Sequence, residues 1–526
     1  MSNLTKATLR GVSWNTAATV ATAAMQIGYT AVMARLLPPA AFGLVALAGV
    51  VLRFGTYLAQ MGLEQALVQK PDLSEADVRA TFTTAIGLGT LATLVLVAAA
   101  PLAPLVLREP AVVPLIQALA LSLFITGLSA TAISLLRREM AFGTLALMQT
   151  VAYVVAYGGL GIGLALKGFG VWSLVAATLG QGLITAGWAY AATRHSLRLY
   201  FHWAHYRPLL RYGSRITLTS FLEFITSSLD TLLVGRLLGA AALGLYNRAW
   251  MLVTLPLYLL TNSVSRVIFP AFSQVQANQP KLRTVYLAST TLVAAGVLPV
   301  CAGVAVAAPE LVRALLGPGW AAAVPVLRVM CLAVPLSLIT MFAGIVCDAR
   351  AALAAKIRVN LVALATLLGL FGLLHGYGLL GFATALVLNE LVRTALFLHL
   401  MRQELAAPYP RLLGLYGPGL WHAAAVGGGL WLARAALLPL AWPAPALLAA
   451  QMLVGAVLLA VVALWRPAPA LRHALHQLLS RLDLAASTGR AGQLLARYAG
   501  FLNRRAGYAG AESEAFTALP SNVLQP

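Results

Sequence analysis

Residues 35–44 read Arg-Leu-Leu-Pro-Pro-Ala-Ala-Phe-Gly-Leu, and residues 236–245 read Arg-Leu-Leu-Gly-Ala-Ala-Ala-Leu-Gly-Leu. The match extends without gaps from residues 10–44 to residues 211–245, where 11 of 35 aligned positions are identical. Self-similarity at a constant offset, here 201 residues, indicates an internal duplication. We therefore predict that the fold is built from two copies of one structural unit.

Apolar residues dominate the rest of the sequence. Of the 526 residues, 60% are hydrophobic and 10% are charged, whereas an ordinary soluble domain has roughly 25% charged residues. A membrane-spanning helix needs about 20 apolar residues, and we predict an all-α integral membrane protein with about fourteen such helices. These predicted spans lie at residues 11–35, 42–69, 80–107, 111–136, 140–166, 170–193, 212–236, 242–268, 284–308, 321–347, 355–375, 379–402, 415–438 and 444–465.

Basic residues are unevenly distributed between the loops that connect these spans. With the N-terminus in the cytoplasm, roughly 24 lysine and arginine residues fall on the cytoplasmic side and about 6 on the other, as positive-inside orientation requires. We therefore predict that both termini are cytoplasmic. The same loops, together with anionic lipid headgroups, explain the net charge of +21 without nucleic acid as a partner.

The two copies of the repeat begin on the same side of the membrane, so the repeat is parallel and relates helices 1–6 to helices 7–12 about an axis along the membrane normal. We predict two pseudo-symmetric six-helix lobes plus two C-terminal helices. Two such lobes enclose a central cavity that opens alternately to either side, which is a transporter's architecture. The predicted parts are an N-lobe (1–195), an interfacial cytoplasmic linker (196–210), a C-lobe (211–405), helices 13 and 14 (412–466) and an amphipathic or disordered cytoplasmic tail (467–526).

Several ionisable residues within the predicted spans are candidates for a transport role. A charge inside the bilayer costs about 2.5 to 3.5 kcal/mol, so each needs a partner, a water-filled cavity or a function. Arg53 and Glu223 lie about 11 residues into their spans, near the expected midplane, where they are able to face each other across the cavity. Asp230 and Arg248 lie at similar distances from the outer ends of neighbouring spans, and we expect them to form a local pair.

Three further candidates lie in the second half of the chain. Glu390 and Arg393 are spaced i, i+3, which makes them neighbours on one helix face, and such a pair most often neutralises itself and holds helices together. Arg328, about 7 residues inside its span, is able to extend its charge toward the outer surface. The sequence leaves open whether these charged residues bind a substrate or only join helices.

Catalytic and nucleotide-binding signatures are missing from the sequence. It has no Walker loop, dinucleotide fingerprint, nucleophile elbow or metal-ligand helix. Cys301, Cys331 and Cys347 lack the spacing of a metal site. We predict that the protein is not an enzyme and has no catalytic residues, cofactor or metal. Any driving energy then comes from an ion gradient or from the substrate's own gradient.

Three runs near the middle of the chain form a known pattern. They are Asp-Thr-Leu-Leu-Val-Gly-Arg-Leu-Leu-Gly at 230–239, Leu-Gly-Leu-Tyr-Asn-Arg-Ala at 243–249 and Arg-Val-Ile-Phe-Pro-Ala-Phe-Ser at 266–273. Together with the elbow at 34–43, they resemble the polysaccharide-lipid flippases. These are the Wzx-type lipopolysaccharide biosynthesis proteins of the multidrug/oligosaccharidyl-lipid/polysaccharide exporter superfamily. The resemblance covers about residues 5–465 in span layout, and its specific motifs occupy a smaller part of that range.

This resemblance implies a flippase in a bacterial cytoplasmic (inner) membrane. Its expected cargo is an undecaprenyl-diphosphate-linked oligosaccharide, moved from the cytoplasmic to the outer face by alternating access for O-antigen, capsule or exopolysaccharide synthesis. Expected partners are membrane lipids, H+ or Na+ as a coupling ion, and a polysaccharide polymerase or glycosyltransferase complex. The candidate residues are Arg53, Arg248 and Arg328 for the diphosphate, and Glu223, Asp230 and Glu390 as cavity acids or ion-coupling groups.

Two other functions are compatible with parts of the sequence. An ion-coupled antiporter of small molecules or drugs would also have two parallel six-helix lobes, although the motifs and the arginine-biased core argue against it. A membrane polymerase or ligase generally needs a sizeable extracytoplasmic segment, which the short predicted outer loops do not provide.

Overall fold

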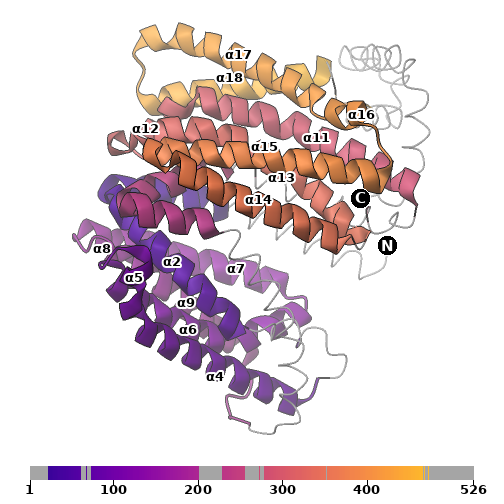
Figure 1. The fold of residues 1–526 in the computed structure, drawn as a ribbon. Helices are drawn as coiled ribbons and strands as arrows, with labels where there is room; N and C mark the ends of the chain where they lie inside the picture. The colour runs from indigo at the N-terminus through magenta and orange to yellow at the C-terminus, as the bar shows by residue number, and fades with distance from the viewer. Residues whose placement is uncertain are drawn as a thin grey trace, which may run out of the picture. The chain divides into compact units, whose positions relative to one another are not determined.

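The computed structural model describes residues 22–60, 73–200, 228–254, 278–350 and 352–465, together with the single positions 67, 257, 272, 467 and 472. Every regular element in these ranges is helical (Figure 1). Ten of the described helical segments are long and apolar enough to cross a membrane. The predicted all-α membrane fold is therefore confirmed. The number of fourteen spans stays a prediction, because parts of the first and seventh predicted spans lie outside the described residues.

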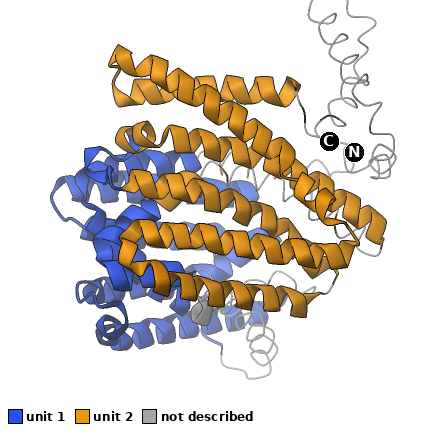
Figure 2. Cartoon of the chain, turned by 45° about the horizontal axis from the view of Figure 1, so that its top comes forward, with its two compact units in different colours: residues 1–248, 315–322 blue, residues 249–314, 323–526 orange. Residues whose placement is uncertain are grey.

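Packing divides the chain into two units, which Figure 2 shows in different colours. Unit 1 comprises residues 1–248 and 315–322, and unit 2 comprises residues 249–314 and 323–526. The predicted lobes are defined by the sequence repeat rather than by packing, so their boundaries stay a prediction.

Unit 1 is a helical bundle in which α6 packs against α2, α4 and α9. A hydroxyl group strengthens one of these contacts, since Thr93 Oγ1 of α4 donates to the carbonyl oxygen of Ala120 in α6 at 3.0 Å. The described helices of this unit are residues 22–36, α2 (Pro39–Gln60), α4 (Glu75–Ala99), η1 (Ala100–Leu102), α5 (Ala103–Leu107), α6 (Val112–Arg138), α7 (Phe142–Tyr153), the π-helix η2 (Val154–Gly161), α8 (Ile162–Leu166), α9 (Trp172–Thr193), the first part of the helix Ser228–Thr254 and the short 3-10 helix η3 (Pro318–Trp320).

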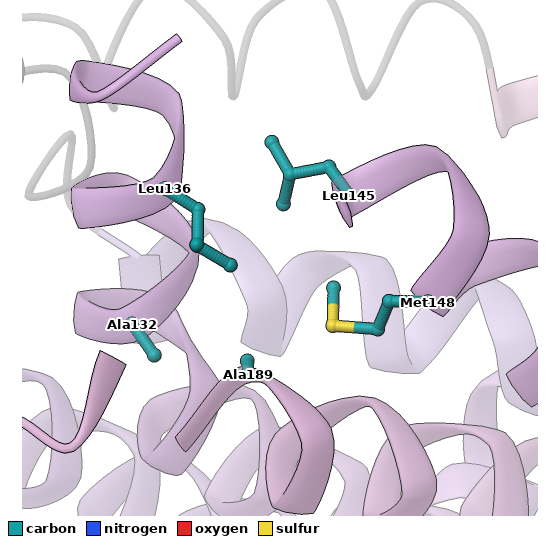
Figure 3. Packing of buried hydrophobic residues seen from close by; sticks show 5 residues of the cluster. All are labelled: Ala132, Leu136, Leu145, Met148 and Ala189. Carbon is teal, nitrogen blue, oxygen red and sulfur yellow. The ribbon is translucent and has the colours of Figure 1, made fainter. Parts of the chain in front are cut away.

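Apolar side chains at helical spacing join α6, α7 and α9. Ala132 and Leu136 lie four residues apart on α6, so they share one face of that helix. They pack against Leu145 and Met148 of α7 and against Ala189 of α9 (Figure 3). Met148 and Ala189 are fully buried, and the small alanines let the helix backbones approach closely.

Contacts between connecting segments define one end of unit 1. The indole Nε1 of Trp320 donates to the carbonyl oxygen of Ala34 at 2.8 Å, and Arg236 Nη1 donates to the carbonyl oxygens of Leu105, at 3.1 Å, and Val106. We call the region around residues 37–38, 102–111, 239 and 315–322 the Trp320 end.

The opposite end of unit 1 holds a different set of connections. Arg79 Nε donates to the carbonyl oxygen of Arg198 at 3.4 Å, and the backbone N–H of Tyr200 donates to Thr83 Oγ1 at 2.9 Å. Arg138 Nη1 reaches the carbonyl oxygen of Leu67 at 3.3 Å. Predicted outer loops thus gather at the Trp320 end and predicted cytoplasmic loops at the other. The membrane face at each end stays a prediction.

Unit 2 is a second helical bundle, in which α13 packs against α11 and α15. Beyond these, α14 packs on α15, while α17 packs on α11 and carries α18. Its helices are α11 (Gln279–Val306), α12 (Ala308–Leu315), α13 (Ala323–Ala349), α14 (Leu353–Leu374), η4 (His375–Tyr377), α15 (Gly378–Leu405), α16 (Tyr409–Gly414), α17 (Gly417–Leu437), η5 (Leu438–Leu440) and α18 (Ala444–Trp465).

Candidate functional site

The two copies of the repeat meet each other inside unit 1. A Cβ atom added to Gly43 would overlap the carbonyl oxygen of Ala240, and one added to Gly244 would overlap that of Pro39. Gly43 corresponds to Gly244 in the repeat, and Pro39 corresponds to Ala240. A reciprocal contact of this kind is what a twofold relation between equivalent segments produces. The contact therefore supports the duplication that the sequence predicts.

Arg248 lies in this same part of unit 1. Its guanidinium carbon is 4.2 Å from the centre of the Phe42 ring of α2, a cation–π distance. Its Nη1 lies 3.5 Å from Thr30 Oγ1 on the helix 22–36, at the limit of a hydrogen bond. Two residues of the first copy, Thr30 and Phe42, thus contact this arginine side chain.

Three tyrosines gather beside Thr30. The Tyr29 ring packs edge-on against Tyr157, with ring centres 4.9 Å apart, and against Tyr153 at 6.3 Å. Tyr153 and Tyr157 stack at 4.6 Å, and the phenols of Tyr29 and Tyr153 lie within electrostatic range of Arg248. We call Tyr29, Tyr153 and Tyr157 the tyrosine cluster.

The tyrosine cluster coincides with an irregularity of the backbone. Tyr157 lies within the π-helix Val154–Gly161, and Tyr153 directly precedes it. π-Helical insertions are rare and frequently occur at functional sites, because the extra residue re-aims the side chains of that turn. A hydrogen bond between the hydroxyls of Tyr157 and Thr178, 3.3 Å apart, connects this turn to α9.

The chemistry of this cluster suits a phosphorylated, sugar-bearing ligand. The planar guanidinium offers N–H groups in the geometry that phosphate oxygens accept, and aromatic rings provide flat apolar faces with a polar hydroxyl at the edge. The arginine, the tyrosine cluster, Thr30 and Phe42 are therefore our candidate site.

Asp230 has other partners than the sequence suggested. Its carboxylate accepts hydrogen bonds from the hydroxyl of Tyr246 at 2.7 Å and from the backbone N–H of Thr231 at 2.7 Å. The expected local pair of Asp230 with Arg248 is therefore wrong. Tyr246 precedes Arg248 by two residues, so their side chains project to opposite sides of the helix, and it is Tyr246 that faces Asp230.

Of the other predicted binding residues, those that the structure describes are not part of this cluster. Arg53 is exposed on α2, and Glu223 lies outside the described residues, so their predicted proximity stays untested. Arg328 belongs to unit 2, where it is exposed and its Nε donates to the carbonyl oxygen of Ala305, near the end of α11, at 3.2 Å. Of the three predicted arginines, the structure places Arg248 among aromatic and hydroxyl groups.

Glu390 forms the ion pair predicted with Arg393. The Glu390 carboxylate lies 3.0 Å from Arg393 Nη1 on α15. Its neighbour Asn389 is 6% exposed, and the Asn389 Oδ1 has no hydrogen-bond partner among the described residues. The pair is thus part of a partly buried polar region within unit 2.

A second ion pair in unit 2 was not predicted. Glu310 of α12 accepts from Arg434 of α17 at 2.9 Å, and only 7% of the Glu310 side chain is exposed. Both residues lie in predicted outer loops or at their edges. Their position on the same side of the membrane is the sequence signal that could have predicted the pair. Among the described residues, no group of three or more histidine, cysteine, aspartate or glutamate side chains is placed to hold a metal ion.

The described helices form apolar bundles long enough to cross a membrane, and they hold the half-buried Arg248 beside the tyrosine cluster. Residues 32–325 match the family model described as polysaccharide biosynthesis protein. The chain belongs to this family.

The names of curated relatives agree with this assignment, and a solved structure shares the fold. The chain is 24% identical over 330 residues to the lipopolysaccharide biosynthesis protein WzxC of Escherichia coli (62% of this chain, 67% of that one). It is 28% identical over 328 residues to the succinoglycan biosynthesis transport protein ExoT of Rhizobium meliloti (62% and 66%). Its fold is similar to that of the lipid II flippase MurJ in an inward closed conformation, with a TM-score of 0.66, 14% identity and coverage of 86% of this chain and 98% of that chain.

Proposed function

We propose that the protein is a flippase that moves undecaprenyl-diphosphate-linked oligosaccharide repeat units from the cytoplasmic to the outer face of a bacterial inner membrane. The proposal is supported by the family and by relatives whose names refer to lipopolysaccharide biosynthesis and to succinoglycan transport. The observation that carries it is the position of Arg248 beside Thr30, Phe42 and the tyrosine cluster.

In this proposal Arg248 binds the diphosphate and the tyrosine cluster receives the adjoining sugar. A diphosphate in a low-dielectric site requires a cation, and arginine meets two phosphate oxygens with parallel N–H groups. Arg53 and Arg328 are further candidates for contact with the diphosphate. Glu223, Asp230 and Glu390 are candidates for coupling transport to H+ or Na+.

The proposed orientation follows from the loops. The N- and C-termini lie in the cytoplasm, the lobes 1–195 and 211–405 rock against each other, and the Trp320 end faces outward. Lipid-linked substrate then enters from the inner leaflet and leaves on the other side after the lobes have changed their tilt.

Substitution of Arg248 tests the proposal most directly. In a strain that lacks the chromosomal gene and any redundant exporter, we expect lipid-linked repeat units to accumulate on the cytoplasmic face. Complementation with Arg248→Ala should restore less than about 1% of surface polysaccharide, and Arg248→Lys about 10%, because lysine keeps the charge but not the planar donors.

Arg411→Ala is the matched control, since Arg411 is exposed on α16, and it should complement fully. Immunoblotting of membranes checks that all variants are inserted in equal amounts. Normal surface polysaccharide in the deletion strain would refute the flippase. Ion-coupled uptake of soluble cations by the purified protein would point to an antiporter, and flipped but unpolymerised units outside the cell in an Arg53→Ala strain would point to a polymerase.

A further inference from the structure

The segment 315–322 packs in unit 1, although the chain on both sides of it belongs to unit 2 (Figure 2). It carries Trp320, the largest of the fully buried side chains, with 1% of its surface exposed. Leu316 of the same segment is 0% exposed. Connecting segments normally run over the surface of a protein, so a buried tryptophan at this place indicates an inserted loop.

The indole of Trp320 supplies a hydrogen bond that the neighbouring helix cannot make for itself. The carbonyl oxygen of Ala34 would ordinarily accept from the N–H four residues later, but that residue is Pro38, which has no N–H. Trp320 Nε1 donates to this oxygen at 2.8 Å, whereas the preceding carbonyl, of Met33, is satisfied by the N–H of Leu37 at 2.8 Å. Trp320 therefore caps the C-terminal end of the helix 22–36.

The same tryptophan is connected to the candidate site through one ring. Phe42 packs edge-on against Trp320, with ring centres 5.4 Å apart, and also lies 4.2 Å from the guanidinium carbon of Arg248. Phe42 is 4% exposed. Aromatic pairs and cation–π contacts both depend on ring orientation, so the position of Trp320 fixes the surface against which Arg248 rests.

We infer that Trp320 is a positioning residue for the diphosphate. With the segment 315–322 inserted, Trp320 holds Phe42, and Phe42 holds Arg248 in the orientation that binds the ligand. When the Trp320 end opens, the segment withdraws and Phe42 is no longer held in place. Arg248 then binds the diphosphate more weakly, so the ligand departs on that side. This inference rests on the proposed function.

Insertion of the segment 315–322 and binding of the diphosphate are thermodynamically linked in this scheme. If insertion of the segment raises the affinity for the diphosphate, the bound diphosphate must stabilise the inserted segment by the same factor. A role of Trp320 in stability alone would produce no such coupling.

The first experiment measures binding of undecaprenyl diphosphate to the purified full-length protein in detergent. Trp320→Ala, which removes both the ring contact and the donor, should weaken binding about tenfold, the scale of a buried cation–π contact. Trp320→Phe keeps a ring against Phe42 and should stay within about threefold of the wild type. Trp172→Ala is the matched control, because Trp172 is an exposed tryptophan of the same unit, and it should bind like the wild type.

A double variant separates positioning from folding. In a protein with Arg248→Lys, the additional change Trp320→Ala should not weaken binding further, since the two residues act through one pathway. Independent losses that add, or wild-type affinity in Trp320→Ala, would overturn the inference. If the wild-type protein itself did not bind undecaprenyl diphosphate, the proposed function would fail and this inference with it.

The second experiment follows the segment itself. In a protein whose three buried cysteines are replaced with alanine, Leu316→Cys reports withdrawal of the segment through its reaction with a maleimide. Undecaprenyl diphosphate should slow this reaction, and Trp320→Ala should speed it several-fold. A labelling rate that does not change with the ligand contradicts the coupling.

Discussion

The two copies of the repeat share their points of contact but differ in one charge near them. Gly43 and Gly244 occupy equivalent positions and make equivalent close approaches. Four residues further along, however, the first copy has Leu47, which is fully buried, and the second has Arg248. Duplication has thus kept the contact between the two copies symmetric, and we call this contact around Gly43 and Gly244 the seam. In the proposed function, an arginine in only one copy at this position would give the ligand a single orientation.

The largest expected loss of stability comes from placing an arginine at Leu47, the position in the first copy that corresponds to Arg248. We expect Leu47→Arg to lower membrane insertion or stability by about 3 kcal/mol, because a charge would enter an apolar position. The converse change, Arg248→Leu, should leave the amount of protein in the membrane unchanged while abolishing polysaccharide export. Immunoblots and export assays of both variants distinguish the two outcomes. Equal abundance and export for both variants would mean that the charge difference between the copies has no consequence.

The equivalent glycines of the two copies should be equally sensitive to substitution. Gly43→Ala and Gly244→Ala each place a methyl group against a carbonyl oxygen of the other copy, and each should destabilise the protein by about 2 kcal/mol. The double variant should cost less than the sum, because the first substitution already separates the helices. Melting temperatures in detergent measure these changes.

Gly49→Ala provides the control for both glycines. It lies on α2 as Gly43 does, but an added Cβ meets nothing within 4 Å, so its stability should equal or slightly exceed that of the wild type. If only one of the two seam glycines were sensitive, the twofold relation of the copies would not extend to their energetics.

Sequence reasoning identified the repeat, though not the contact between its copies, because the offset of 201 residues pairs glycine with glycine and arginine with arginine. It also predicted the Glu390–Arg393 pair, since both residues lie on one helix and the i, i+3 geometry is local. It failed for Asp230 because distance from a helix end gives depth in the membrane but not the direction in which a side chain projects.

The position of Trp320 could not be predicted from the sequence for a different reason. Its loop has no periodic pattern that would assign it to a helix face, and insertion of a loop depends on tertiary packing. The available signal was indirect, because Pro38 leaves the carbonyl of Ala34 without its usual donor. A search for carbonyls orphaned by proline would have indicated that a donor was needed, but not which residue provides it.

The smallest expected loss of stability comes from removing the hydrogen bond between Tyr246 and Asp230. Asp230 corresponds to Tyr29 of the first copy, and Tyr246 to Val45, so the hydrogen bond between Tyr246 and Asp230 has no equivalent there. Tyr246→Phe removes the donor and keeps the ring, and it should destabilise the protein by about 1.5 kcal/mol, because the lost hydrogen bond goes to a carboxylate. Tyr190→Phe, at a tyrosine that is 39% exposed, should change the melting temperature little.

Combining Tyr246→Phe with Asp230→Asn tests whether the hydrogen bond between the two residues depends on the charge of Asp230. An asparagine oxygen still accepts a hydrogen bond but carries no charge, so loss of the Tyr246 hydroxyl should then cost only about 1 kcal/mol. If Tyr246→Phe also reduced export far beyond its effect on stability, Asp230 would take part in transport, as its candidacy for ion coupling requires. If export followed stability in every variant, the pair would serve only to join the helices of the second copy, and the asymmetry of function would rest on Arg248 and its aromatic neighbours.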